Sequence, residues 1–189
     1  MLKSQIIRSV EKLVRDACIA PGNPYGERYW RYHIQIVVKL AKKLAKQNNV
    51  DAEIMELAAL LHDYGQVIDP ENAKNHHITG AKQAKIVLLK YNYPTSGIKL
   101  IQKCILSHRG STNISKTTKE ERILADADAM SHILNLPNLF YYAYSIAKMD
   151  VGEGKLWVKN ELEKCWSKMS DRSQKLVIIE YKAAKLMLN

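Results

Sequence analysis

The sequence has no apolar run that approaches the roughly 18 residues a membrane-spanning helix needs. Its first residues, MLKSQIIRSVEKLVRDA, alternate apolar and charged side chains at helical spacing and lack the continuous apolar segment of a secretory signal. Cysteine is scarce: the three cysteines are far apart and form no CxxC pair. Such usage argues against a disulfide framework and against a thiolate zinc site. We therefore expect a cytoplasmic protein that does not contact membranes.

Alternating strand patterns, internal repeats and low-complexity linkers are also lacking. Apolar residues instead recur at helical spacing along all 189 residues. The pattern predicts helices near residues 3–19, 28–47, 52–63, 76–91, 96–108, 119–134, 138–149, 153–169 and 172–188. Capping signals support several of these starts, namely Asn75, Thr95 and the capping box formed by Thr118 and Glu121. We predict a single all-α domain, a multi-helix bundle of about nine helices.

The charge balance is basic, since 29 Lys and Arg residues against 19 Asp and Glu residues give a net charge of +10. An anionic partner such as a nucleotide or a nucleic acid would explain this excess. However, the lysines do not cluster, and the aromatic residues do not alternate with them as a stacking platform for nucleic acid would. Diffuse surface charge is therefore the favoured interpretation, and a nucleic-acid partner is the less favoured one.

The most informative stretch reads ELAALLHDYGQ, in which an apolar helix ends on His62 and Asp63. The helix is apolar nearly all round, as expected of one that is buried within a bundle. The two polar side chains are adjacent, so both can lean toward one point beyond the helix end. Buried carboxylates are nearly always paired or bound to a metal. Asp63 therefore requires a partner from elsewhere in the chain.

Two further histidines lie in the apolar stripes of their own helices. At about 100° per residue, His33 lies in line with Val37 and Leu44, and His108 lies in line with Ile105. A single inward histidine is more often a hydrogen-bonded core residue than a metal ligand. Several of them aimed at one interior point form a far more specific pattern.

The helix that contains EERILADADAMSHI carries two aspartates. Asp126 shares its face with Ile123 and Met130, whereas Asp128 falls on the opposite side. The wheel therefore predicts Asp126 as the inward carboxylate. We interpret Asp128 and His132 as surface groups or as outer partners of metal ligands.

Four helices thus each direct histidine or carboxylate toward a common interior. Imidazole and carboxylate, without a soft thiolate, form the ligand set of Zn, Fe, Mn or Ni. A cation is also the simplest partner for both carboxylates, because two unpaired ones could not both stay ionised there. The sequence therefore predicts a metal site among these inward residues, which are His33, His62, Asp63, His108 and Asp126.

This order of residues resembles the HD-domain superfamily of metal-dependent phosphohydrolases. LHDYG follows the inward His33 by about thirty residues and precedes a distant aspartate in LADAD. The resemblance covers roughly residues 28–132 and implies an HD-type bundle, with helices 138–189 packed on the metal-binding core. It also implies that metal-activated water hydrolyses a phosphomonoester or phosphoanhydride of a small, nucleotide-like substrate.

Some members of the superfamily hold a second metal with two additional histidines, and this sequence has candidates in the same order. The register of HHITGA selects His76, whereas the wheel favours His77, which stays open as the alternative. By the resemblance, four ligands would hold the first metal, namely His33, His62, Asp63 and Asp126. His76 and His108 would complete a second site, with Asp63 bridging the two. Many relatives carry a lysine soon after the HD pair, but this chain has Gln66, so no catalytic role is transferred to that position.

The resemblance also implies functional roles. Asp63 would orient or deprotonate the attacking water, and Arg109 could hold a phosphate bidentately, with a solvated arginine after the helix as the alternative. The cofactor would be one or two divalent ions of Fe, Mn, Zn, Ni or Co, with Mg as a further option. Alternative functions are a di-iron oxygenase of the same fold and a basic nucleic-acid-binding module with a structural metal. The tyrosine-rich NLFYYAYSIAKM is typical of a core or a subunit contact, which leaves homo-oligomerisation open.

Overall fold

The computed structural model describes residues 3–109 and 114–188, and within these ranges the chain forms helices and no strand. The elements in chain order are α1 (Lys3–Ile19), α2 (Gly26–Tyr29), the π-helical turn η1 (Trp30–Ile34), α3 (Gln35–Asn48), α4 (Ala52–Leu61), α5 (Tyr64–Ile68), the 3-10 turn η2 (Pro70–Asn75), α6 (His76–Lys90), α7 (Thr95–Ser107), α8 (Lys119–Leu134), α9 (Leu136–Tyr141), the π-helical turn η3 (Tyr142–Ile146), α10 (Val151–Lys168), α11 (Asp171–Leu176) and α12 (Ile178–Leu188). The predicted all-α class is confirmed. No helix in the described part of the chain is both long enough and apolar enough to cross a membrane.

Several predicted helices are subdivided in the structure. The helix predicted at 28–47 contains the π turn η1, and the one predicted at 172–188 divides at Val177, where the backbone leaves the helical region. The segment after the HD pair, for which the sequence predicted no helix, forms the short α5 and η2. Such short turns contain too few residues for a periodic apolar pattern to show.

The capping predictions met with mixed outcomes. The Thr118 hydroxyl accepts from Glu121 N, and the Glu121 side chain accepts from Thr118 N, so this capping box is confirmed. The Asn75 side chain makes no capping bond, and α7 begins at Thr95 itself, with Pro94 before it. The prediction of Thr95 as a cap is therefore wrong, whereas Asn75 occupies the predicted N-cap position of α6 without a capping bond from its side chain.

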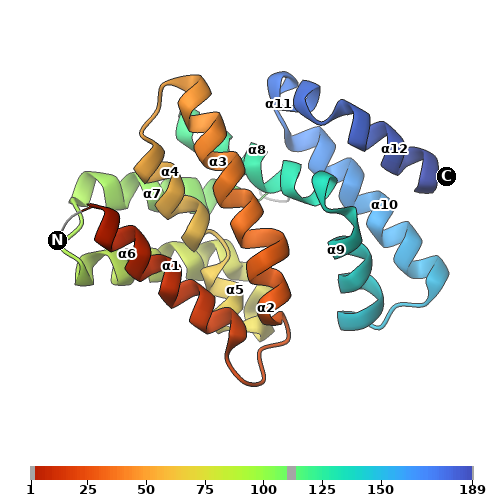
Figure 1. Ribbon diagram of the computed structural model, residues 1–189, viewed down its shortest axis with the longest axis horizontal. Coiled ribbons are helices and arrows are strands. Elements are labelled where there is room, and N and C mark those ends of the chain that lie inside the picture. The colour runs from red at the N-terminus through yellow and green to blue at the C-terminus, as the bar shows by residue number, and fades with distance from the viewer. Residues whose placement is uncertain (1–2, 110–113, 189) are drawn as a thin grey trace.

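Helix α8 lies at the centre of the fold. It packs against α3, α4 and α7 on one side and against α10 and α12 on another, and Figure 1 shows it running between these two groups of helices. Because α8 has neighbours on several sides, every residue from 123 to 131 is buried. Its polar side chains in that span must therefore find partners inside the protein.

A close contact between glycines sets the position of α6. A Cβ atom on Gly65 would lie 2.5 Å from both Gly80 N and His76 O, so a larger residue there would collide with backbone. A Cβ atom on Gly80 would in turn lie 3.2 Å from His62 O. This approach brings the first turn of α6 next to the break between α4 and α5, where His62 and Asp63 lie.

Candidate metal centre

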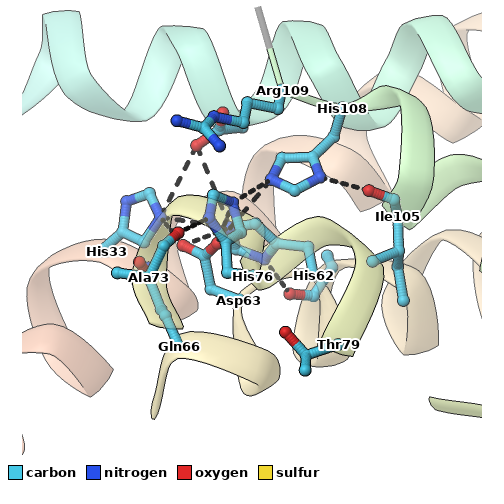
Figure 2. A network of polar contacts seen from close by, with 12 residues as sticks. His33, His62, Asp63, Gln66, Ala73, His76, Thr79, Ile105, His108 and Arg109 are labelled. Carbon is cyan, nitrogen blue, oxygen red and sulfur yellow. Dashed lines mark hydrogen bonds and ion pairs between the residues drawn. The ribbon is translucent and has the colours of Figure 1, made fainter. Parts of the chain in front are cut away.

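A cluster of histidine and carboxylate side chains fills the space between the ends of these helices. Its members come from η1, from the break after α4, from the first turn of α6, from the end of α7 and from α8: they are His33, His62, Asp63, His76, His108 and Asp128. All are buried except the half-buried His76. Figure 2 shows the four imidazoles arranged around the Asp63 carboxylate.

The two oxygens of Asp63 face different pairs of histidines. Oδ2 lies 3.1 Å from the Nε2 atoms of both His33 and His62. Oδ1 lies 3.3 Å from His76 Nε2 and 3.7 Å from His108 Nε2. The carboxylate therefore lies between two imidazole pairs, as a ligand shared by two cations would.

Asp128 extends the first pair. Its Oδ1 lies 3.6 Å from His33 Nε2 and 4.0 Å from His62 Nε2. The described residues thus contain two groups with metal-ligand spacing: His33, His62 and Asp128 form the first, and Asp63, His76 and His108 form the second.

The spacing between nitrogens agrees with metal binding. The Nε2 atoms are 3.2 Å apart both in the His33–His62 pair and in the His76–His108 pair. Two nitrogens bound to one ion at about 2.1 Å, at angles of about 90–109°, would lie about 3.0–3.4 Å apart. Each group can therefore hold a divalent cation without rearrangement of its histidines.

Hydrogen bonds also set the tautomer that a metal requires. The Nδ1 atoms of His62, His76 and His108 lie 2.7, 2.7 and 2.6 Å from backbone carbonyl oxygens, which can only accept. Each Nδ1 must therefore carry the proton, and Nε2 is left to ligate.

His33 reaches the same state through a hydroxyl group. Its Nδ1 lies 3.1 Å from Ser131 Oγ, and that hydroxyl donates to Asp128 O at 2.7 Å. Because the Ser131 proton is used in this way, His33 Nδ1 donates and His33 Nε2 carries the lone pair.

The surroundings shift the pKa values of His33 and His62 in opposite directions. Burial lowers the pKa of His33 to about 4. Burial would lower the pKa of His62 as well, but the Asp63 carboxylate outweighs it and raises that pKa to about 9. Burial likewise fails to raise the pKa of Asp63, which the neighbouring histidines, and the charge of His62 above all, hold well below its ordinary value. A cation binding at these nitrogens must displace the proton of His62.

The structure corrects the predicted fourth ligand, since Asp126 lies away from the cluster. Its carboxylate accepts from Ser170 N at 3.0 Å, from Ser170 Oγ at 2.5 Å and from Ser173 Oγ at 2.7 Å. Asp126 is buried as predicted, but the prediction that it joins the histidines is wrong, because α8 is buried on both sides and its apolar residues do not mark one face. Asp128 takes the position beside His33 and His62.

The structure also decides between His76 and His77, the two candidate ligands in α6. His76 lies in the cluster, whereas His77 is buried elsewhere, and its Nδ1 has no hydrogen-bond partner among the described residues. Arg109 follows His108 and donates through Nη1 to Lys74 O, which holds its guanidinium beside the histidines.

Two residues that the sequence analysis did not assign support Asp63. The Tyr29 hydroxyl donates to Asp63 Oδ2, and Gln66 Nε2 donates to the Tyr29 oxygen. Gln66 thus acts on the cluster through Tyr29. Tyr29 precedes His33 by four residues, so extending the helical wheel by one turn would have found it.

Asp128 is supported by residues far apart in sequence. Lys168 of α10 donates to Asp128 Oδ2 at 2.6 Å, and His132 Nε2 lies 3.5 Å from Asp128 Oδ1. The His132 ring also stacks on His33, with centroids 4.9 Å apart. Despite burial, the charge of Lys168 and then His132 hold the pKa of Asp128 well below its ordinary value. No local signal links Lys168 to α8, because 40 residues separate it from Asp128.

The cluster opens into a cleft of about 500 Å³, which is within the size range of small-molecule sites. Asp63, His76, His108 and Asp128 line its inner end. The outer walls come from the C-terminal half, where the tyrosine-rich segment contributes Tyr142 and α10 contributes Trp157, Lys164 and Lys168, among others. The segment NLFYYAYSIAKM, interpreted from sequence as core or subunit contact, therefore forms part of the cleft wall.

Comparisons with known proteins agree with this geometry. The model of the HD domain matches residues 30–133, which is more than half of the chain. Ribonuclease Y of Mycoplasma mycoides is 35% identical over 107 residues, a match that covers 57% of this chain but only 19% of that protein. An uncharacterised protein of Clostridium beijerinckii is 27% identical over 103 residues, covering 53% of this chain and 63% of that one. This chain thus matches only part of the length of these relatives.

Solved structures resemble the whole chain. An HD-superfamily hydrolase from Bacillus thuringiensis superposes with a TM-score of 0.73 at 18% identity, covering 99% of this chain and 95% of that one. A protein from Lactobacillus plantarum superposes with a TM-score of 0.77 at 17% identity, covering 100% and 95%. At these identities the likeness shows a shared fold. Together with the family match over the residues that form the cluster, it shows that this chain belongs to the HD domain family.

Proposed function

We propose that this protein is a metal-dependent phosphohydrolase that cleaves a phosphomonoester or phosphoanhydride of a small, nucleotide-like substrate. The observation that carries the proposal is the Asp63 carboxylate between two pairs of imidazoles at the inner end of a cleft. Nitrogen and oxygen ligands of this kind suit Fe, Mn, Zn, Ni or Co. A divalent metal bound there would lower the pKa of a coordinated water and polarise a phosphoryl oxygen.

The protein's own groups fix the geometry of this site. The Nδ1 hydrogen bonds of His62, His76 and His108 hold the rings with Nε2 toward the cluster. Burial and the neighbouring Asp63 charge keep the pKa of Tyr29 well above its ordinary value, so its hydroxyl stays protonated and donates to Asp63. Asp63 is thereby kept ionised and oriented to position a nucleophilic water.

The cleft also offers groups for a nucleotide. Arg109 lies next to His108 at the inner end, where a guanidinium can bind a phosphate bidentately. Lys164 contributes a further cation, with its ammonium 2.6 Å from Glu161 Oε1. Tyr142 and Trp157 stack on each other with centroids 5.1 Å apart, and such a pair can contact an aromatic base. These contacts support a small substrate that combines phosphate with a ring.

The similarity to Ribonuclease Y motivates a second candidate, hydrolysis of an RNA phosphodiester. A metal held by the histidine and carboxylate cluster would supply the same activated water in either reaction. A substrate screen separates the two, because an RNA hydrolase would cleave single-stranded oligoribonucleotides faster than mononucleotides.

The proposal is tested by metal analysis and activity of the purified protein before and after chelation. We expect bound transition metal, turnover of mononucleotides or dinucleoside polyphosphates, loss of that turnover after chelation, and recovery on addition of Mn²⁺ or Co²⁺ without oxygen. Turnover that survives complete chelation contradicts the proposal. Turnover that requires both iron and oxygen would instead favour the oxygenase alternative.

Lys168→Met tests the support of Asp128 by α10. We expect metal affinity to fall by about 10-fold to 100-fold, because the carboxylate loses the partner that orients it. In the metal-free protein, the free energy of unfolding is expected to drop by about 3 kcal/mol, since the buried Asp128 carboxylate loses its nearest cation. Titration with Mn²⁺ and urea unfolding measure the two effects. Lys168→Arg should recover much of both, and Lys175→Met on α11 should change neither; equal metal affinity in Lys168→Met would contradict the role.

A further inference from the structure

A second pocket, of about 250 Å³, lies against α8, away from the histidine and carboxylate cluster. It is formed where the end of α3 meets the starts of α8 and α11. Its basic side chains are Lys116, Lys119, Arg122 and Arg172, and we refer to it as the basic pocket. None of these residues lines the cleft at the histidine and carboxylate cluster.

The basic pocket carries a clear excess of positive charge. Asp126 is its acidic lining residue, against the four basic ones, which leaves three positive charges in excess. The Asp126 carboxylate is buried and already accepts three hydrogen bonds from Ser170 and Ser173. Its oxygens are directed to these donors, and its charge offsets one of the four cations.

Two of the cations are held in place by the end of α3. Arg172 Nη1 donates to Asn48 Oδ1 at 3.2 Å, and Asn48 Nδ2 in turn donates to Leu44 O at 2.7 Å. Lys119 Nζ lies 3.5 Å from Asn48 O. A guanidinium and an ammonium fixed in this way lose less conformational entropy when an anion binds.

The remaining cations repel each other. Lys116 is half-buried, and burial, followed by the charges of Lys168 and Arg122, lowers its pKa. An anion among these groups would relieve that repulsion.

We infer that the basic pocket is a second binding site, separate from the metal centre, for the pyrophosphoryl group of a small phosphorylated molecule. The excess of positive charge matches the several negative charges of linked phosphates. The volume is below the roughly 300–1,000 Å³ of sites for drug-sized ligands, so the pocket can enclose a phosphate chain and not a whole nucleotide. Arginine and lysine around one cavity provide both bidentate and point-charge contacts.

Calorimetric titration of the full chain with inorganic pyrophosphate tests this inference. The titration is done on chelated protein at physiological ionic strength, so neither metal nor catalytic activity contributes and failure of the proposed hydrolase function would leave the result intact. We expect one pyrophosphate per chain. In Arg122→Ala/Arg172→Ala the dissociation constant should rise about 100-fold, because each lost charge-assisted hydrogen bond weakens binding about tenfold.

The matched control is Lys82→Ala/Lys85→Ala, which removes the same charge from the exposed face of α6. It should bind pyrophosphate like the wild type, and circular dichroism of both variants should show an unchanged fold. No binding by the wild type, wild-type binding by the arginine variant, or equal weakening in both variants would overturn the inference.

Further ligands identify the source of the phosphate chain. ATP that binds more tightly than pyrophosphate, with no binding of adenosine, would support a nucleotide; equal affinities would support a free phosphate chain. A single-stranded oligonucleotide that binds more tightly than either, and depends on Arg122 and Arg172, would overturn the assignment to a small molecule.

Discussion

Asp63→Asn is expected to reduce catalytic activity by about a thousandfold or more. The amide keeps the shape of the carboxylate but loses the negative charge that faces both histidine pairs at 3.1–3.7 Å. Binding of a cation by either pair is therefore weakened. Metal content should fall well below that of the wild type, and turnover of the best nucleotide substrate measures the loss of activity.

Thermal unfolding with and without Mn²⁺ tests the same variant independently of its activity. Metal that binds only the folded protein raises its melting temperature, so the wild type should be stabilised by Mn²⁺ and Asp63→Asn should not. Asp69→Asn is the matched control, since it makes the same change six residues later, outside the cleft. Wild-type metal content and turnover in Asp63→Asn would contradict the assignment of Asp63 as the shared ligand.

The pair Asp128→Asn and Asp126→Asn is expected to give opposite results. Asp128→Asn removes charge from the group with His33 and His62, so metal affinity and turnover should each fall by about a hundredfold or more. Asp126→Asn should keep its metal and lose at most a few-fold in turnover. Its free energy of unfolding should fall by about 1–3 kcal/mol, because the hydrogen bonds from Ser170 and Ser173 are weakened.

Metal analysis, steady-state kinetics and urea unfolding of the two variants decide between the aspartates. The two substitutions are chemically identical and lie on one helix, so general effects of charge removal cancel in the comparison. If Asp126→Asn lost its metal and Asp128→Asn retained it, the arrangement of α8 described above would be wrong.

The failure to choose the correct aspartate has an identifiable cause. A helical wheel assigns direction only when one face is apolar and the other is polar. Within α8, every residue from 123 to 131 is buried, because helices pack on several sides of it. The wheel therefore separated Asp126 from Asp128 on a distinction that the packing does not respect. The neighbours that tell the two aspartates apart are Ser170 and Lys168, which lie in the C-terminal part of the chain.

The reverse holds for His33, His62 and His108. His33 and His108 lie in clear apolar stripes, and His62 ends a helix that is apolar nearly all round, so the local pattern alone placed all three inside the fold. His76 and His77 occupy the first turn of α6, where a wheel has too few residues to define a direction. The contact of Gly65 with the backbone of α6 fixes the rotation that brings His76 to Asp63.

The sequence by itself determined the all-α class, because helical periodicity is a local property, and it determined that His33, His62, Asp63 and His108 point inward. Only the tertiary structure decided which aspartate joins them, that Tyr29 and Lys168 support the carboxylates, and that the tyrosine-rich segment lines the cleft. The physical reason is that these outcomes depend on contacts between residues distant in sequence. Such contacts arise from the way helices pack around α8, which no local pattern of residues encodes.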